Sequence, residues 1–289
     1  MRHIVVGAVA YAPQIVPIWD IIREYARAYF GDIALDYVLF SNYERQVQWL
    51  MEGKIDIAWN TNVAFIRSQF ATNNGVEAIL MRDTDVGFKS VFVAQKGKIK
   101  QVQDLVGKSF GLGSLDSAQA AIMPLYYLKK LSIPYKELAL GDTSLEAQSK
   151  AVRIYRFNSD VGKHGDTGRS EFDVLDRIRD GALDAGAIGS STWVRIMQEG
   201  SYPHIESFYA SPEYCHCNFT TLRTFDSGLK KAFVEMMCSQ NEAKDNAQIT
   251  QMMSMEGLNK WIICDAQILK GYDEVAAAMR EQNLLHLVN

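Results

Sequence analysis

The segment Cys215-His216-Cys217 places two thiols on either side of an imidazole. Thiolates and imidazole nitrogens bind transition metals, and a thiolate beside an imidazole can act as a nucleophile. Neighbouring residues of a strand point to opposite faces, so a strand here would set both thiols on one side and His216 on the other. Structural zinc normally requires a second ligand pair, and Cys238 and Cys264 each stand alone, so we expect no zinc knuckle.

A catalytic metal would need ligands from elsewhere in the chain. His216 and His164 are the candidate imidazole ligands. Asp166 or Glu171 would supply a carboxylate, which gives the two-histidine, one-carboxylate arrangement that holds non-haem iron. The alternatives are ordinary buried thiols and a histidine that hydrogen-bonds a bound ligand. The sequence therefore leaves open whether a transition metal such as iron is bound, and whether the triplet supplies catalytic residues.

A second set of candidates follows the apolar strands of the first third of the chain. Polar and aromatic residues come directly after three such runs, and parallel strands bring their carboxyl ends to one edge of a sheet. Hydroxyl, amide and aromatic groups at that edge would suit a small polar ligand. The predicted ligand contacts in this part are Tyr11, Ser41, Tyr43, Trp59, Asn60 and Thr61. Helix capping is the alternative for Ser41 and for residues 60–62.

Further polar candidates lie in the middle of the chain. The run "GLGSLDSAQAA" leads from a strand through two glycines to a helix that begins near Ser117. Backbone N–H groups and serine hydroxyls at such a turn suit a phosphate, phosphonate, sulfonate or carboxylate. The run is neither a dinucleotide-binding fingerprint nor a P-loop. With a polar loop over 159–175 and the segment "GSSTW", the predicted contacts are Ser114, Asp116, Ser117, Gln119, His164, Asp166, Thr167, Ser190 and Trp193.

These side chains need a scaffold of strands and helices, and the hydrophobic pattern predicts one. The strand-like runs "HIVVGAV", "IALDYVLF" and "IDIAWN" alternate with segments of helical period, and a similar series starts after Lys100. This order is typical of an α/β fold with two mostly parallel sheets flanked by helices. We expect residues 1–92 to form the first part of one lobe, 93–220 the second lobe, and 221–289 a return segment with the C-terminal helices.

Composition limits the possible functions. The 289 residues, 48% of them apolar, supply enough core for two lobes. A net charge of −4 offers no basic surface for nucleic acid, and no run approaches the ~20 apolar residues of a membrane span. Met1 leads straight into a strand, so the chain as written is expected to be cytoplasmic, or periplasmic if a signal peptide was removed.

The order of several segments resembles the phosphate/phosphonate-type periplasmic substrate-binding proteins of ABC transporters. These segments are "GAVAYAP", "SNYERQVQWLMEGKIDIAWNTNVAF", "DLVGKSFGLGSLDSAQAA" and "GKHGDTGRSEFDVLDRIRDGALDAGAIGSSTW". The resemblance implies a type II periplasmic-binding fold, in which two α/β lobes joined by two crossing strands close on an anionic ligand, with an ABC permease as partner. It implies that Ser114, Ser117 and Gln119 grip the anion and that His164 and Asp166 reach the cleft.

Two functional hypotheses follow. The first is binding of a small anionic or zwitterionic ligand, phosphonate-like, phosphate-like or carboxylate-bearing, in a cleft between two lobes. The second is a cytoplasmic enzyme on the same fold that depends on non-haem iron or a thiolate and uses the cysteine–histidine triplet with His164 and Asp166. The fold is shared by binding proteins and enzymes, so it does not choose between them.

Overall fold

The structure is a computed structural model that describes residues 2–142, 150–157 and 169–286. The chain forms two compact units, of which unit 1 contains residues 1–87 and 214–289 and unit 2 contains residues 88–213. The chain therefore passes between the units twice, at 87/88 and at 213/214. The boundaries expected after residues 92 and 220 fall inside strands β5 (Ser90–Gln95) and β11 (Asn218–Leu222). Each of these strands belongs to one sheet along its whole length, so the division comes before it.

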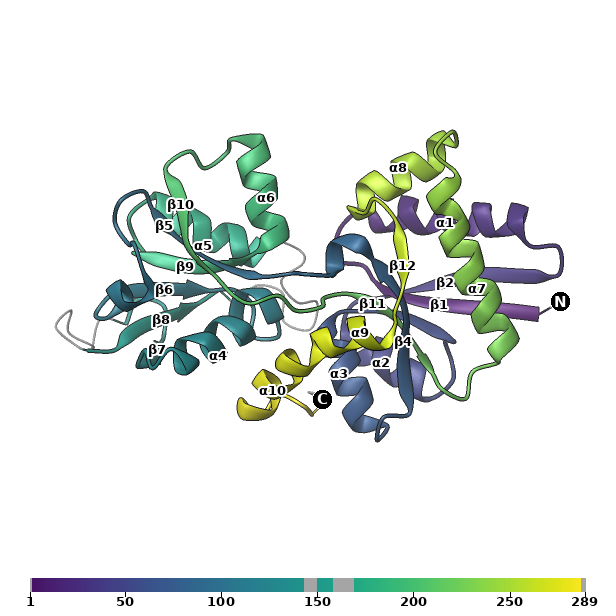
Figure 1. The fold of residues 1–289 in the computed structure, drawn as a ribbon, viewed down its shortest axis with the longest axis horizontal. Helices are drawn as coiled ribbons and strands as arrows, with labels where there is room; N and C mark the ends of the chain where they lie inside the picture. Colours follow the sequence, from purple (N-terminus) through teal and green to yellow (C-terminus); the bar gives the residue numbers. More distant parts are fainter. Residues whose placement is uncertain (1, 143–149, 158–168, 287–289) are drawn as a thin grey trace. The chain divides into compact units, whose positions relative to one another are not determined.

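Unit 1 is built on a six-stranded sheet with the order β12-β4-β11-β3-β1-β2 (Figure 1). Its remaining strands are β1 (Arg2–Val9), β2 (Ile33–Phe40), β3 (Ile57–Asn60), β4 (Val76–Arg82) and β12 (Trp261–Ile263). β1 pairs in parallel with β2 and β3, whereas β11 runs antiparallel to β3 and β4, and β12 runs antiparallel to β4. The return of the chain as β11 thus places the segment after residue 213 in the middle of the first sheet.

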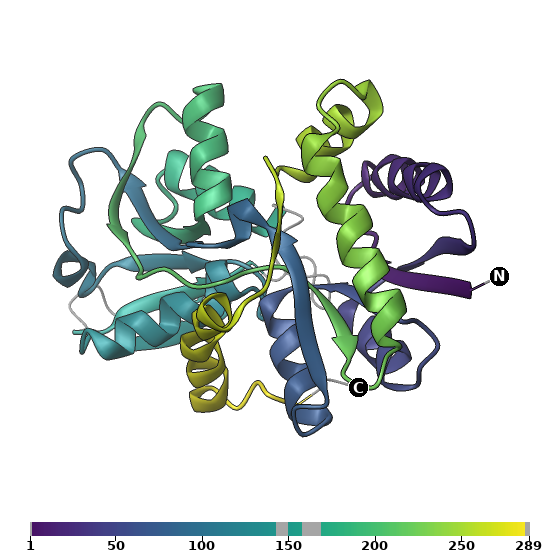
Figure 2. The ribbon, with the colours of Figure 1, turned by 45° about the vertical axis from the view of Figure 1, so that its right-hand side comes forward.

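Helices cover both faces of this sheet (Figures 1 and 2). One face packs against α1 (Ile15–Tyr29), α7 (Ser227–Ser239) and α8 (Ala247–Glu256), whose apolar side chains share one core with the strands. The other helices are α2 (Tyr43–Met51), α3 (Asn62–Ala71), α9 (Ala266–Leu269) and α10 (Asp273–Glu281), with short 3₁₀ turns η1 (Asp83–Asp85), η5 (Gln240–Glu242) and η6 (Lys270–Tyr272). α3 contacts both α2 and α10 on the opposite face of the sheet.

Unit 2 contains a second six-stranded sheet with the order β10-β5-β9-β6-β8-β7. Its strands, besides β5, are β6 (Ser109–Leu112), β7 (Tyr135–Leu138), β8 (Val152–Arg156), β9 (Ala185–Gly189) and β10 (Ile205–Ala210). β6 pairs in parallel with β8 and β9, and β7 with β8, whereas β5 is antiparallel to both of its neighbours. The predicted fold class, α/β with two mostly parallel sheets, is confirmed.

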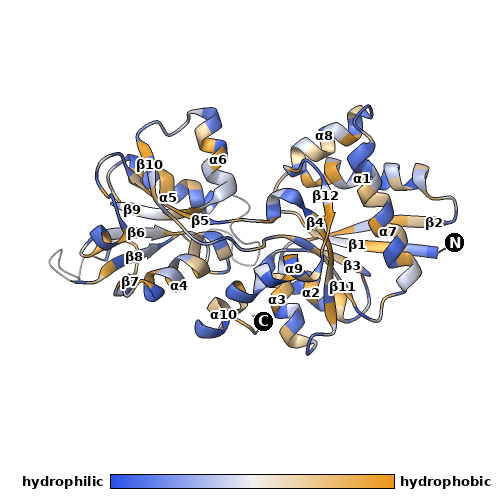
Figure 3. Cartoon of the chain, in the orientation of Figure 1, coloured by the Kyte–Doolittle hydropathy of each residue, from blue (hydrophilic) through white to orange (hydrophobic). Residues whose placement is uncertain are grey.

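The two faces of the unit 2 sheet have separate cores. Residues of α4 (Met123–Lys130) and of the 3₁₀ turn η2 (Val102–Leu105) pack on one face, and residues of α5 (Arg169–Arg179) and α6 (Ser190–Glu199) pack on the other. The π-helix η3 (Ala118–Ile122) leads directly into α4. Figure 3 shows hydrophobic residues concentrated in the strands of both sheets and polar residues along the outer sides of the helices. No helix in the described part of the chain is both long and apolar enough to cross a membrane.

Candidate functional site

The turn between β6 and η3 in unit 2 contains the serines that were predicted to bind an oxyanion. β6 ends at Leu112, and the N–H of Gly113 donates to the carbonyl of Ala120 over 2.9 Å, which folds the turn onto the start of the helix. A Cβ at Gly113 would lie 2.7 Å from the Cβ of Ala120, so this close approach requires glycine. Ser117 caps the helix, because its hydroxyl accepts from the N–H of Ala120 at 3.2 Å.

Ser114 is the most informative residue of this turn. Its side chain is fully buried, and its N–H donates to the hydroxyl of Ser170 at 3.3 Å. Its own hydroxyl, however, has no hydrogen-bond partner within the part of the chain that the structure describes. A buried polar group without a partner costs free energy, and in native proteins it usually marks a place where a ligand, an ion or a water binds.

Glu171 ties three segments of unit 2 together beside the turn. It lies in the first turn of α5 and is 1% exposed. One carboxylate oxygen accepts from the Gln119 side-chain amide at 3.1 Å, and the other accepts from the N–H of Gly189 at 2.9 Å. The sequence indicated Glu171 as a possible metal ligand only. Its position at the start of a helix was visible in the sequence, but its two partners were not.

The remaining predicted contacts of unit 2 have different surroundings. The Ser190 hydroxyl accepts from the N–H of Lys89 at 3.1 Å, and Trp193 packs against the core beneath α5 and α6. Asp116 is buried in the turn itself, with 7% of its surface exposed. His164, Asp166 and Thr167 lie outside the described residues.

In unit 1, Asn60 has the clearest potential to contact a ligand. It ends β3, is fully buried, and accepts from the Gln46 side-chain amide through Oδ1 at 2.8 Å. Within the described residues, neither the Asn60 amide nitrogen nor the Gln46 amide oxygen has a hydrogen-bond partner. Asn60 therefore offers an unused donor and stays a predicted ligand contact.

The other predicted contacts of unit 1 have structural roles or lie apart. Trp59 is 3% exposed and packs against Phe219, with ring centroids 4.6 Å apart, so the structure places it in the core. Thr61 caps α3 by accepting from the N–H of Ala64, and Asn42 rather than Ser41 caps α2. Of the last three predicted contacts, Tyr11 is half-buried and packs against the core, Ser41 is exposed, and Tyr43 is buried.

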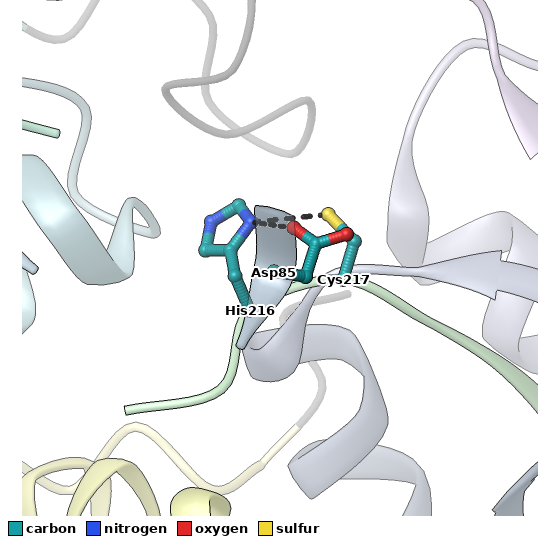
Figure 4. Close-up of side chains that lie close together, drawn as sticks. All are labelled: Asp85, His216 and Cys217. Carbon is teal, nitrogen blue, oxygen red and sulfur yellow. Dashed lines mark hydrogen bonds and ion pairs between the residues drawn. The ribbon is translucent and has the colours of Figure 1, made fainter. Parts of the chain in front are cut away.

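The cysteine–histidine triplet lies just before β11 and outside any regular strand. The strand alternation expected for it is therefore wrong, because the segment is not a strand and the side chains of two neighbouring residues lie in contact. The Nδ1 atom of His216 lies 3.1 Å from Sγ of Cys217 and 3.4 Å from Oδ1 of Asp85, as Figure 4 shows. Cys215 points elsewhere, with its thiol donating to the carbonyl of Ile268 at 3.3 Å.

Asp85 belongs to a buried ionic network that the sequence did not predict. Its two carboxylate oxygens accept from Nε and Nη2 of Arg82 at 2.6 and 2.8 Å. Arg82 also donates to the carbonyl of Glu256 at 2.7 Å and lies over the ring of Trp59, 5.2 Å from its centroid. Burial alone would raise the pKa of the Asp85 carboxyl, but the Arg82 guanidinium and the bond from His216 hold that pKa below its usual range.

This network is poorly suited to metal binding. The possible ligand atoms lie within 4.8 Å of one another and belong to Asp85, His216 and Cys217. This set shares only His216 with the predicted metal site, which also included His164 and Asp166. Both oxygens of Asp85 already accept from Arg82, and a metal cation would have to displace that guanidinium from a buried carboxylate. The three groups therefore fit a hydrogen-bonded ion network better than a metal site.

The Cys215 thiol and the contacts of His216 also argue against the enzyme hypothesis, in which Cys215 or Cys217 was the reactive thiol. Burial raises the pKa of the Cys215 thiol to about 11 and that of the Cys264 thiol to about 12, with smaller contributions from neighbouring negative groups. Both thiols are thus protonated at neutral pH and are weak nucleophiles. His216 directs the same nitrogen, Nδ1, at Asp85 and at Cys217, so this nitrogen cannot accept the thiol proton and donate to the carboxylate at once.

Two α/β units on mostly parallel sheets, connected by two passages of the chain, define a type II periplasmic-binding fold. The structure of PhnD1 from Prochlorococcus marinus (MIT 9301) in complex with methylphosphonate is similar over 98% of this chain and 99% of that chain, with a TM-score of 0.70 and 19% identity. A binding-protein component of an ABC phosphonate transporter from Pseudomonas aeruginosa is similar over 99% of this chain and 89% of its own, with a TM-score of 0.65 and 15% identity.

The family model described as "ABC transporter, phosphonate, periplasmic substrate-binding protein" matches residues 10–261. The chain belongs to this family. It is also 22% identical, over 86% of its length and 80% of the relative's, to the probable ABC transporter phosphite-binding protein PhnD1 of Prochlorococcus marinus (strain MIT 9301). These relatives are named as binding proteins, and they lend no support to the enzyme hypothesis, to metal binding or to iron.

Proposed function

We propose that this protein binds a phosphonate-type oxyanion and that the turn from β6 to η3 in unit 2 holds it. Membership of the phosphonate-binding family supports the ligand class. Relatives named for phosphite and for a methylphosphonate complex point to the same chemistry. The observation that carries the proposal is the fully buried Ser114 hydroxyl, which has no hydrogen-bond partner within the described chain.

The chemistry of the turn suits an oxyanion. The first N–H groups of a helix have no partners inside the helix, and the positive end of its dipole attracts negative charge. η3 and α4 together form a continuous helical segment that begins at this turn, and Ser117 caps it. Glu171 holds the Gln119 amide in place through the bond described above. Binding would therefore use oriented neutral donors that are in place before the ligand arrives, with no covalent step.

We further infer that the protein serves as the substrate-binding component of an ABC transporter and works in the periplasm, as its family does. The partner would be a permease that receives the ligand. The expected result is that the ligand-loaded protein stimulates ATP hydrolysis by its cognate permease complex in liposomes more than the ligand-free protein does. Equal stimulation with and without ligand would contradict this role.

Ser114→Ala provides the sharpest test of the ligand site. A hydrogen bond to a charged group contributes about 1.5–3 kcal/mol, so the variant should bind methylphosphonate roughly 10- to 100-fold more weakly in calorimetric titration. Its thermal stability without ligand should not fall, because the lost hydroxyl has no partner within the described chain.

Ser68→Ala is the matched control. Ser68 is equally buried, but it lies in α3 and its hydroxyl donates to the carbonyl of Ala64 at 2.7 Å. This variant should lose stability and keep its affinity. Unchanged affinity in Ser114→Ala would refute the proposed site, and no binding of methylphosphonate, phosphite, phosphate or methanesulfonate by the native protein would refute the proposed ligand class.

A further inference from the structure

Unit 2 contains a pocket that the proposed oxyanion turn does not use. The pocket has a volume of about 370 Å³, which falls within the range of small-molecule sites in proteins. Its lining combines two arginines with apolar and aromatic side chains, chiefly Arg153, Arg177, Tyr155, Phe157, Leu140 and Leu183.

The alternation of β8 builds this pocket. Val152 and Ile154 point into the core beneath α4, whereas Phe157 lies in the core beneath α5 and α6 and Tyr155 packs against that core. Arg153 precedes Tyr155 by two residues and therefore points to the same face of the sheet. β8 and β7 are the last two strands on this side of the sheet (Figure 1). The cationic and aromatic side chains thus share one face beside the edge of the sheet.

The pocket and the oxyanion turn are separate places in unit 2. Ser109, the first residue of β6, lines the pocket, whereas Ser114 lies two residues beyond the other end of that strand. The serines of the turn, Ser114 and Ser117, are not part of the lining.

The two arginines of the pocket differ from the other arginines of this region. Arg156 is held by Glu137 through bonds of 2.8 and 3.0 Å, and Arg179 is held by Asp176 and Asp180. Among the described residues, the side chains of Arg153 and Arg177 make no hydrogen bond or ion pair, and Nε of Arg153 is buried without a partner. A buried guanidinium N–H without an acceptor is costly, so this position favours an anionic guest.

The rest of the lining suits the apolar part of a guest. The hydroxyl of Tyr155 donates to the carbonyl of Asp142 at 2.9 Å, which fixes its ring at the wall of the pocket. Leu140 is 63% exposed and would gain burial from an apolar guest. Asp142 also belongs to the lining, so the lining residues carry a net charge of one positive unit.

We propose that this pocket is a second binding site, for an organic anion that carries an oxyanion group on an aromatic body. Arg153 and Arg177 bind the oxyanion group, and the ring packs against Tyr155, Phe157 and Leu140. Guanidinium groups suit this task because they bind planar or tetrahedral oxyanions through paired N–H donors and also stack on aromatic rings.

Calorimetric titration with phenyl phosphate, in the presence of saturating methylphosphonate, tests the proposal on the full chain. The native protein should bind one phenyl phosphate, and Arg153→Gln and Arg177→Gln should each weaken that binding roughly 10- to 100-fold. Arg179→Gln is the matched control, because Arg179 lies on the same helix as Arg177 but outside the lining, and it should change the Kd by less than about 3-fold.

Further measurements separate this site from the oxyanion turn and from a folding defect. Phenyl phosphate should still bind Ser114→Ala, and it should shift the methyl NMR signals of Leu140 and Leu183. Because the Arg177 side chain is exposed, Arg177→Gln should fold, and it can test the proposal even if Arg153→Gln does not fold. Three results would each overturn the proposal: no binding to the native protein, loss of binding when methylphosphonate is added, or arginine variants that bind as tightly as the native protein.

Discussion

Replacement of Asp85 by asparagine should strongly destabilise unit 1. The carboxylate of Asp85 is 1% exposed and is bonded to two nitrogens of Arg82 and to Nδ1 of His216. Asparagine keeps the shape but removes the charge. In the described chain this leaves the largely buried Arg82 guanidinium with one carboxylate partner, that of Glu256 at 3.3 Å. Breaking a buried ion pair from one side costs about 3–5 kcal/mol. With a urea m-value of about 2 kcal/mol per molar, the unfolding midpoint should fall by roughly 1.5–2.5 M.

Tryptophan fluorescence in urea can measure this change in unit 1. Trp193 is the one tryptophan of unit 2, so Trp193→Phe gives a background in which fluorescence reports unit 1. Asp32→Asn is the matched control, because its partner Arg2 lies at 3.1 Å but the carboxylate is 74% exposed. Exposed pairs contribute little, so this control should shift the midpoint only slightly.

A double-mutant cycle separates the ion pair from other effects of the substitution. Arg82→Met leaves the Asp85 carboxylate buried without its main partner and should also be strongly destabilising. The double variant removes both charges, so its loss should be clearly smaller than the sum of the two single losses. Additive losses, or a loss below about 1 kcal/mol for Asp85→Asn, would refute the assignment of this pair as a main stabiliser of unit 1.

The same variant should alter the acid limb of the stability curve. The folded-state pKa of Asp85 is lower than that of the unfolded chain, which is near 3.9 for an aspartate. The stabilisation by its charge is therefore complete above about pH 4 and is lost as the pH falls from there through the folded-state pKa. Asp85→Asn lacks this contribution at every pH, so its stability should fall less steeply than that of the native protein below about pH 4. Parallel curves would contradict this expectation.

Two further predictions concern packing in unit 2 and thiol reactivity in unit 1. Gly186→Ala would push a Cβ into the side chain of Val174 and should destabilise unit 2 by about 1–3 kcal/mol in thermal unfolding. Gly31→Ala is the control, because open space surrounds that position, and it should not lower the stability. Equal melting curves for the two variants would contradict the close packing at Gly186. In the folded protein at pH 8, iodoacetamide should label Cys215 and Cys264 far more slowly than in urea. Their raised pKa values leave roughly one thiol in a thousand or fewer as the reactive thiolate. Mass spectrometry after a timed quench measures the labelling rate, and fast labelling of the folded protein would contradict this expectation.

The order of elements could be predicted from the sequence because each carries its own local signal. The run "IALDYVLF" coincides with β2, and the run "HIVVGAV" covers all of β1 except its first residue. The oxyanion turn had a local signal too, because two glycines and two serines separate an apolar strand from a helix. Strands, helices and turns that depend on about a dozen neighbouring residues could therefore be predicted without the structure.

The network around Asp85 could not be predicted, because its members come from distant parts of the sequence. Arg82 ends β4, Glu256 ends α8, and His216 precedes β11, which pairs with β4 in the sheet. The expectation for the cysteines of the triplet failed for a related reason, since it assumed a strand where the chain, on entering unit 1, forms no regular strand. No local pattern shows that β11 begins only at Asn218, and none shows which buried charge will have a partner.

The partners of its buried polar groups distinguish the network around Asp85 from the two proposed binding sites. Arg82 and Asp85 use their donors and acceptors on each other and on Glu256, so their burial can be explained by the stability of unit 1 alone. The Ser114 hydroxyl and Nε of Arg153 have no such partner in the described chain, and folding gains nothing from burying them. Their cost is offset only when something outside the chain supplies an acceptor. Removal of the Ser114 or Arg153 side chain should therefore reduce binding without loss of stability. Removal of the Asp85 carboxylate should reduce the stability of unit 1 without reducing binding.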